Sequence, residues 1–183
     1  NTNAEIGDII KVEIHSKEFG RIATQNAKNV ILQKIREEER KVLYDQYFGM
    51  EKEVVTGIVQ RVMGKNVSVN LGKADGVLSE NEQVKGEEFK PTERIKVYIL
   101  EVKDTPKGPR ILVSRTHPGL VKRLFESEVA EVRDGTVEIK SIAREAGSRT
   151  KLAVWSNDPD VDPVGACVGM NGARVNAVVD ELR

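Results

Sequence analysis

Two glycines separated by two residues, Gly169 and Gly172, stand near the end of the chain and are followed by Arg174. The preceding pair Asp162-Pro163 is typical of a helix start, with a capping aspartate and a proline in the first helical position. The apolar residues from position 175 onward recur at helical spacing. The pattern therefore predicts two short helices joined by a Gly-x-x-Gly turn.

A turn of this kind can bind an anion. We expect Gly169 to end the first helix in a left-handed conformation, Asn171 to cap the second helix, and Gly172 to admit another backbone closely. Amides at the start of the second helix attract negative charge. Because Arg174 opposes the helix dipole there, it needs an anionic partner, and a phosphate would be one. A tight helix corner with an exposed Arg174 is the alternative that these residues leave open.

Three other stretches resemble known binding motifs, but none has the residues that its motif requires at each position. Gly64-Lys65 lacks both the upstream glycine and the following Ser or Thr of a phosphate-binding loop. The acidic run from Asp158 begins like a calcium loop but carries Pro163 where that loop needs glycine. The glycine cluster near the end follows a helix start, whereas a dinucleotide-binding fingerprint follows a strand. We therefore predict a protein that is not an enzyme and has no cofactor and no metal.

Composition narrows the class of protein further. The 183 residues include 29 basic and 29 acidic residues, so no global positive charge points to nucleic acid. One cysteine, Cys167, excludes an internal disulfide, and we expect it to be a small buried residue in a cytoplasmic protein. No apolar run is long enough for a membrane span, and the first residues do not resemble a signal peptide.

The elements that must position these residues fall into three stretches. Residues 6–14 read as a strand. The segment between Gly20 and Gly49 reads as one long helix, since it has no Pro or Gly and its apolar residues recur at helical spacing. Residues 50–115 hold five short alternating strands, which predicts a small closed or nearly closed barrel. Residues 117–183 mix a helix from Pro118, a hairpin, and the two short helices around the Gly-x-x-Gly turn. The fold class is α+β and multidomain.

Several runs resemble known RNA-binding families. Residues 166–172 resemble the Gly-x-x-Gly loop of a KH domain, which clamps the backbone of about four single-stranded nucleotides. Residues 50–115 resemble the S1-type OB-fold barrel, another single-strand binder. The runs 19–23, 36–40, 114–118 and 137–147 resemble, in this order, the NusA family of bacterial transcription factors. The resemblance covers essentially the whole chain.

The resemblance implies three parts and a function. Residues 1–49 would be the end of a polymerase-binding N-terminal domain with its connecting helix, residues 50–116 the barrel, and residues 117–183 a first KH domain of type II, incomplete at its C-terminal end. The implied function is to modulate transcriptional pausing, termination and antitermination. The implied partners are nascent single-stranded RNA, RNA polymerase through the N-terminal domain, and other antitermination factors. We expect a cytoplasmic monomer without membrane contact.

Candidate RNA-binding residues follow from the turn, the barrel and the hairpin. Tyr98 is the only obvious stacking platform, because the second strand of the barrel lacks the aromatic pair common in such barrels. The basic candidates of the barrel are more typical of solvated surface charges, whereas those of the hairpin fit RNA contact and a solvated surface equally well. The candidates are Gly169, Met170, Asn171, Gly172, Arg174, Arg61, Lys65, Lys96, Tyr98, Arg110, Lys140, Arg144, Arg149 and Lys151.

Two other functions remain open from the residues. An RNA-processing enzyme such as polynucleotide phosphorylase also joins a KH domain to such a barrel, but in the opposite order and with catalytic carboxylates. A purely structural linker within a larger assembly is the other alternative. Release of nucleoside diphosphates from RNA and phosphate would identify the enzyme.

Overall fold

The computed structural model describes residue 9 and residues 20–182. The strand predicted over residues 6–14 therefore lies outside the described residues, apart from residue 9. The chain divides into two units, residues 1–39 and 40–183. No helix among the described residues is long and apolar enough to cross a membrane.

The predicted long helix is α1 (Arg21–Phe48). The part of α1 that belongs to the first unit ends at Glu39 and has no buried side chain among the described residues. It is stabilised by local ion pairs, such as that between Lys34 and Glu37 at 2.7 Å. In the second unit the last turn of α1 reaches the barrel core. There Tyr47 is buried, and its hydroxyl donates to the carbonyl oxygen of Leu71 at 3.0 Å.

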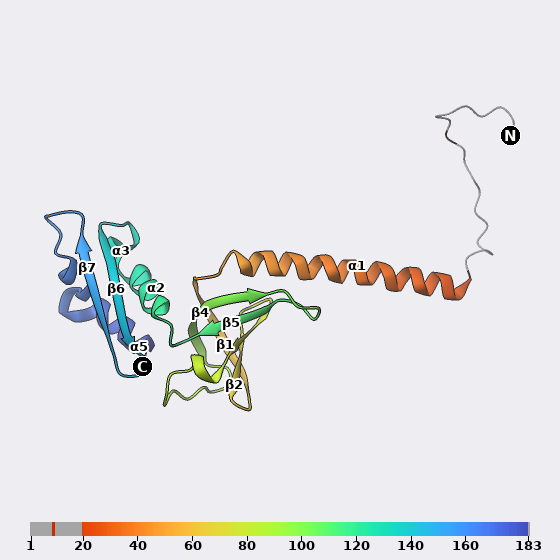
Figure 1. Ribbon diagram of the computed structural model, residues 1–183, viewed down its shortest axis with the longest axis horizontal. Coiled ribbons are helices and arrows are strands. Elements are labelled where there is room, and N and C mark those ends of the chain that lie inside the picture. Colours follow the sequence, from red (N-terminus) through yellow and green to blue (C-terminus); the bar gives the residue numbers. More distant parts are fainter. Residues whose placement is uncertain (1–8, 10–19, 183) are drawn as a thin grey trace. The chain divides into compact units, whose positions relative to one another are not determined.

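The second stretch is a closed five-stranded barrel, as the alternation predicted (Figure 1). Its strands are β1 (Val54–Met63), β2 (Asn66–Asn70), β3 (Asp75–Leu78), β4 (Arg94–Lys103) and β5 (Arg110–Ser114), hydrogen-bonded in the order β1-β2-β3-β5-β4. The β3–β5 pair is parallel and the others are antiparallel. A short 3₁₀ turn, η2 (Glu80–Glu82), follows β3 in the connection to β4. Inward-facing Val and Ile side chains fill the interior.

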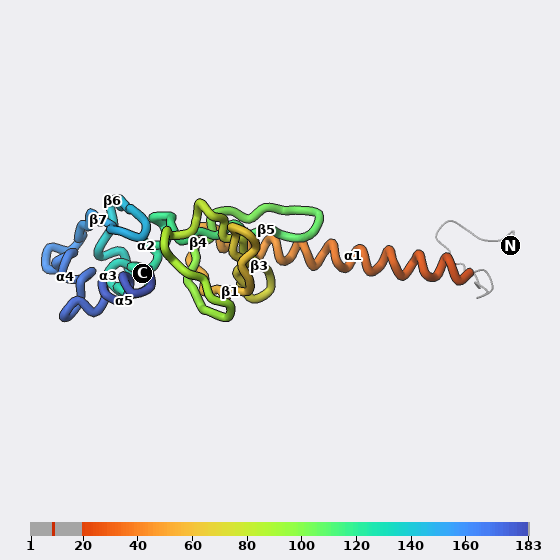
Figure 2. The backbone as a smooth tube through the Cα atoms, turned by 90° about the horizontal axis from the view of Figure 1, so that it is seen from below, coloured from red at the N-terminus to blue at the C-terminus, as the bar shows by residue number. Residues whose placement is uncertain are grey.

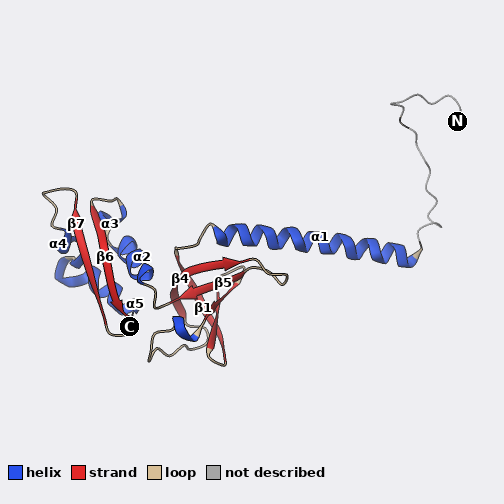
Figure 3. Ribbon diagram, in the orientation of Figure 1, coloured by secondary structure: helices blue, strands red, loops and turns tan. Residues whose placement is uncertain are grey.

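The last stretch pairs a β-hairpin with helices (Figure 3). It contains α2 (Pro118–Glu128), α3 (Ala130–Arg133), β6 (Val137–Glu145), β7 (Arg149–Ser156), α4 (Pro163–Val168), η3 (Met170–Gly172) and α5 (Ala173–Leu182). Apolar residues of α2 and α5 pack with those of β6 and β7 in one cluster. Helices therefore cover one face of the hairpin, as Figure 2 shows. The side chains on its other face are exposed to solvent.

Candidate nucleic-acid interface

The helix that precedes the Gly-x-x-Gly turn begins as predicted. A carboxylate oxygen of Asp162 accepts from the amide of Val164 at 3.0 Å, and its other oxygen accepts from Gly165 at 3.0 Å. Pro163 occupies the first turn of α4. Since α4 is fixed by this cap and by the buried Cys167, its C-terminal end holds the turn in place. Burial raises the pKa of the Cys167 thiol.

The backbone of the turn differs in detail from the prediction. Gly169 has φ 73° and ψ 174°, a conformation that only glycine adopts readily, and not the ordinary left-handed helical one. Asn171 is itself left-handed, with φ 52° and ψ 27°, so it lies inside η3 and does not cap α5. Gly172 has φ 76°, which favours glycine, whereas the space around an added Cβ is less restrictive: its nearest neighbours would be Nδ2 of Asn176 at 3.3 Å and Cγ1 of Val175 at 3.8 Å. The sequence located the turn but not its backbone angles.

Arg174 has an anionic partner within the protein. Its guanidinium donates to a carboxylate oxygen of Glu131 in α3 at 2.9 Å and to the carbonyl oxygen of Ala166 in α4 at 2.8 Å. The predicted anionic partner is therefore Glu131 within the protein, and a contact of Arg174 with RNA phosphate stays a prediction. Arg174 ties the turn to α3 and α4, and we assign it a positioning role.

Arg174 also explains why Gly169 has no side chain. A Cβ built on Gly169 would lie 2.7 Å from Cγ of Arg174 and 3.0 Å from its Cδ. The arginine side chain crosses the backbone at this point on its way to Glu131. The turn thus presents Met170, whose side chain is 86% exposed, and Asn171 to solvent above a braced backbone.

Replacing Gly169 with alanine is expected to destabilise the protein by about 1–3 kcal/mol and to weaken RNA binding. The added methyl group strains the backbone and displaces Arg174 from Glu131. Gly135→Ala is the matched control, because Gly135 also has positive φ (85°) but nothing within 4 Å of the added atom. Thermal unfolding and RNA affinity are measured together. Equal effects from the two substitutions would show that contact with Arg174 is irrelevant.

The structure does not present Tyr98 as an open stacking surface, and its predicted contact with RNA stays a prediction. Its side chain is only 7% exposed, and its ring stacks on His117 with centroids 4.6 Å apart and planes 6° apart. A Cβ built on Gly119 would lie 2.6 Å from the ring, so the backbone of α2 presses against it. Alternation along β4 places Tyr98 on the outside of the barrel, where α2 covers it. Burial raises the pKa of its hydroxyl.

The four basic candidates of the barrel do not form one cluster. Arg61 lies near the end of β1, and Lys65 in the following turn is paired with Glu80 at 3.0 Å. Arg110 begins β5 beside Lys103. Lys96 lies on β4, opposite Thr56 of β1. All except Lys96 are exposed.

Lys96 lines an open groove that the sequence did not indicate. The groove has a volume of about 340 Å³ and lies between β1, β4 and the helices α2 and α3. Arg123 and Arg133 contribute two more cations to it, and Arg123 is paired with Glu53 and Glu126, each at 2.6 Å. These arginines were missed because nothing in their own stretches of sequence links them to the barrel.

The hairpin candidates divide between two environments. Lys140, Arg149 and Lys151 are exposed. Arg144 instead faces the barrel, where its guanidinium donates to the carbonyl oxygen of His117 at 3.1 Å. Burial, followed by the nearby charge of Arg115, holds the pKa of Arg144 below its ordinary value. Unlike the other three hairpin candidates, Arg144 is thus only partly exposed. It is already hydrogen-bonded to His117, and its contact with RNA stays a prediction.

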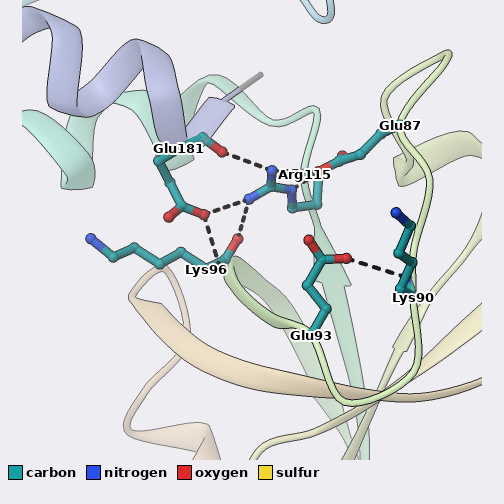
Figure 4. Close-up of polar contacts among 6 residues, drawn as sticks. All are labelled: Glu87, Lys90, Glu93, Lys96, Arg115 and Glu181. Atoms are coloured by element: carbon teal, nitrogen blue, oxygen red, sulfur yellow. Dashed lines mark hydrogen bonds and ion pairs between the residues drawn. The ribbon is translucent and has the colours of Figure 1, made fainter.

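Arg115, which the sequence also did not indicate as important, is 1% exposed and has the largest of the fully buried side chains in the part of the chain that the structure describes (Figure 4). Its guanidinium donates to both carboxylate oxygens of Glu87, at 2.5 and 3.3 Å, and to the carbonyl oxygen of Lys96 at 2.8 Å. It also donates to the carboxylate of Glu181 in α5 and to the backbone carbonyl oxygen of Glu181, each at 2.9 Å. The same carboxylate accepts from the Lys96 amide at 3.1 Å. One buried side chain therefore joins the barrel to the last helix.

Comparison with known proteins assigns each stretch. Residues 50–114 match the profile of the S1 RNA binding domain, residues 115–183 that of the NusA-like first KH domain, and residues 1–41 that of the NusA N-terminal domain. The fold and the turn thus define a protein with two RNA-binding domain types in tandem.

Relatives identify the family. The chain is 56% identical over 178 residues to "Transcription termination/antitermination protein NusA" of Bacillus subtilis (97% of this chain, 48% of the relative). It is 44% identical over 179 residues to the protein of the same name from Thermus thermophilus (97% of this chain, 46% of the relative). The chain belongs to the NusA family, and it spans about half the length of the curated relatives it matches.

Proposed function

We propose that this chain binds nascent single-stranded RNA within a protein that regulates transcriptional pausing, termination and antitermination. The observation that carries the proposal is the Gly-x-x-Gly turn, whose exposed residues Met170 and Asn171 sit on a backbone braced by Arg174 and Glu131. Such a turn can receive a sugar-phosphate backbone without a side chain in the way. The names of the relatives support the link to termination and antitermination.

The proposal assigns a role to each part. Residues 1–49 belong to a domain that contacts RNA polymerase, residues 50–116 form the barrel, and residues 117–183 form the KH domain. Other antitermination factors are further partners. The chain acts by binding and not by catalysis, as a cytoplasmic monomer. Phosphate contacts from Arg61, Lys65, Lys96 and Arg110 add affinity without specifying sequence.

Replacing both Met170 and Asn171 with aspartate is expected to lower the affinity for single-stranded RNA about tenfold or more at low salt. Two carboxylates then face the phosphates at short range. Little stability is lost, because Met170 is exposed and aspartate tolerates the left-handed conformation of Asn171. Fluorescence anisotropy of a labelled RNA measures affinity, and thermal unfolding checks the fold.

The matched control adds the same two charges elsewhere, as Asn26→Asp with Asn29→Asp on the exposed face of α1. This variant should bind RNA as tightly as the wild type. Unchanged affinity in the Met170 and Asn171 variant would reduce the turn to a helix corner. Release of nucleoside diphosphates from RNA and phosphate would overturn the non-enzymatic assignment.

A further inference from the structure

The exposed face of the β6–β7 hairpin carries the single tryptophan of the chain. Trp155 is 59% exposed, although large aromatic side chains normally gain by burial. Along β7, Leu152 and Val154 pack against the helices, whereas Lys151 and Trp155 alternate with them toward solvent. The aromatic ring and the ammonium group therefore share one face of one strand.

Small side chains occupy the space between them. Ala153 lies between Lys151 and Trp155 on β7, and on β6 Ser141 pairs with Ala153 and Ala143 pairs with Lys151. All three small residues are exposed. Lys151 and Trp155 are separated by four residues of extended strand, about 13 Å. The result is a low, open surface with an aromatic side chain at one end and cations at the other.

The cations of this face are available to a ligand. Lys151 has no ion-pair or hydrogen-bond partner among residues 20–182. Arg149 contacts Glu145 at 3.7 Å, and both side chains are largely exposed (76% and 69%), so the pair is weak. The carboxylate nearest Trp155 belongs to Glu138, and it is occupied by Asn157 at 2.7 Å and by Lys140. The unsatisfied charge on the face is therefore positive.

We propose that this face is a second contact site for single-stranded RNA, separate from the Gly-x-x-Gly turn. A base stacks on Trp155, and neighbouring phosphates contact Lys151 and Arg149. Single-stranded RNA fits because it offers flat apolar bases and regularly spaced negative charges together, which is the chemistry that the face complements. An apolar protein surface would cover Trp155 but leave Lys151 without a partner and Arg149 with only its weak pair to Glu145. This inference rests on the RNA-binding function proposed above.

Because Trp155 is the only tryptophan, its fluorescence reports directly on the proposed contact. Titration with an unlabelled single-stranded RNA of about 12 nucleotides should quench the emission in a saturable way. The quenching should weaken as salt is raised, since phosphate contacts are salt-dependent. RNA that binds by anisotropy but leaves the emission unchanged would overturn the inference while the proposed function stands.

Substitution tests the same contact without relying on fluorescence. Trp155→Val keeps a β-branched residue in the strand but removes the ring, and RNA affinity should fall about tenfold. Trp155→Phe retains an aromatic ring for stacking, so its RNA affinity should stay close to that of the wild type. Lys151→Ala should reduce the slope of log affinity against log salt by about one. Lys122→Ala, an exposed lysine on the helical side of the same domain, is the control and should change nothing.

Two further outcomes would overturn the inference. Equal affinities of the wild type and Trp155→Val, with both proteins folded, would show that the ring is not used. A concentration-dependent blue shift of the emission without RNA would show that a second copy of the chain covers Trp155. If the Met170 and Asn171 aspartate variant still quenches on adding RNA, the two sites are separate. Failure of the wild type to bind any RNA would refute the proposed function as well.

Discussion

Replacing Arg115 with methionine is expected to lower the free energy of unfolding by about 3–5 kcal/mol. Methionine keeps much of the side-chain length but removes five donors and the charge. The Glu87 side chain, 1% exposed, is then left as a buried carboxylate without its bidentate partner. The carbonyl oxygen of Lys96 also loses its guanidinium donor. The penalty arises from these stranded groups more than from the lost attraction itself.

The same substitution should uncouple the barrel from the last helix. Arg115 is bonded to Glu87 and Lys96 of the barrel region and to Glu181 of α5. Urea denaturation followed by Trp155 emission, which reports on the hairpin, and by far-UV circular dichroism should coincide in the wild type and separate in the variant. Coincident transitions with an unchanged midpoint would contradict the prediction.

Two controls separate geometry from charge. Arg115→Lys keeps the charge but cannot satisfy Glu87, Lys96 and Glu181 with one ammonium group, so it should recover little of the loss. Arg133→Met removes an exposed arginine and should change stability by no more than about 0.5 kcal/mol.

Local pattern was enough to predict the elements. Alternation of Val and Ile with polar residues located the barrel strands, because one face of each strand fills the barrel and the other faces outward. Asp162 and Pro163 located the start of α4, because a helix cap depends only on neighbouring residues. These signals require no knowledge of distant contacts.

Ion pairs between residues distant in the sequence could not be predicted in the same way. Arg115 stands 28 residues after Glu87 and 66 before Glu181, so its local sequence reads as an exposed charge. Arg174 meets Glu131, which lies 43 residues earlier. Trp155 is different, since its alternation with Leu152 and Val154 was visible in the sequence and could have placed it on the solvent face.

Replacing Tyr98 with alanine is expected to destabilise the protein by about 3–5 kcal/mol while leaving the RNA affinity of the folded protein unchanged. The ring fills the space between β4, His117 and the backbone at Gly119, so its removal opens a cavity between barrel and α2. A stacking platform would behave in the opposite way, losing affinity with little loss of stability. Chemical denaturation and RNA anisotropy on the same preparation distinguish the two.

Tyr98→Phe sharpens this test because it retains the ring. No residue among positions 20–182 hydrogen-bonds the Tyr98 hydroxyl, and burial raises its pKa, so the hydroxyl stays neutral and its loss should cost less than about 1 kcal/mol. If Tyr98→Phe keeps the wild-type stability and Tyr98→Ala loses several kcal/mol, the stabilising contribution of Tyr98 comes from packing of its ring against α2. A loss of RNA affinity in folded Tyr98→Ala would instead return Tyr98 to the RNA-binding surface, and would require the barrel and α2 to separate when RNA binds.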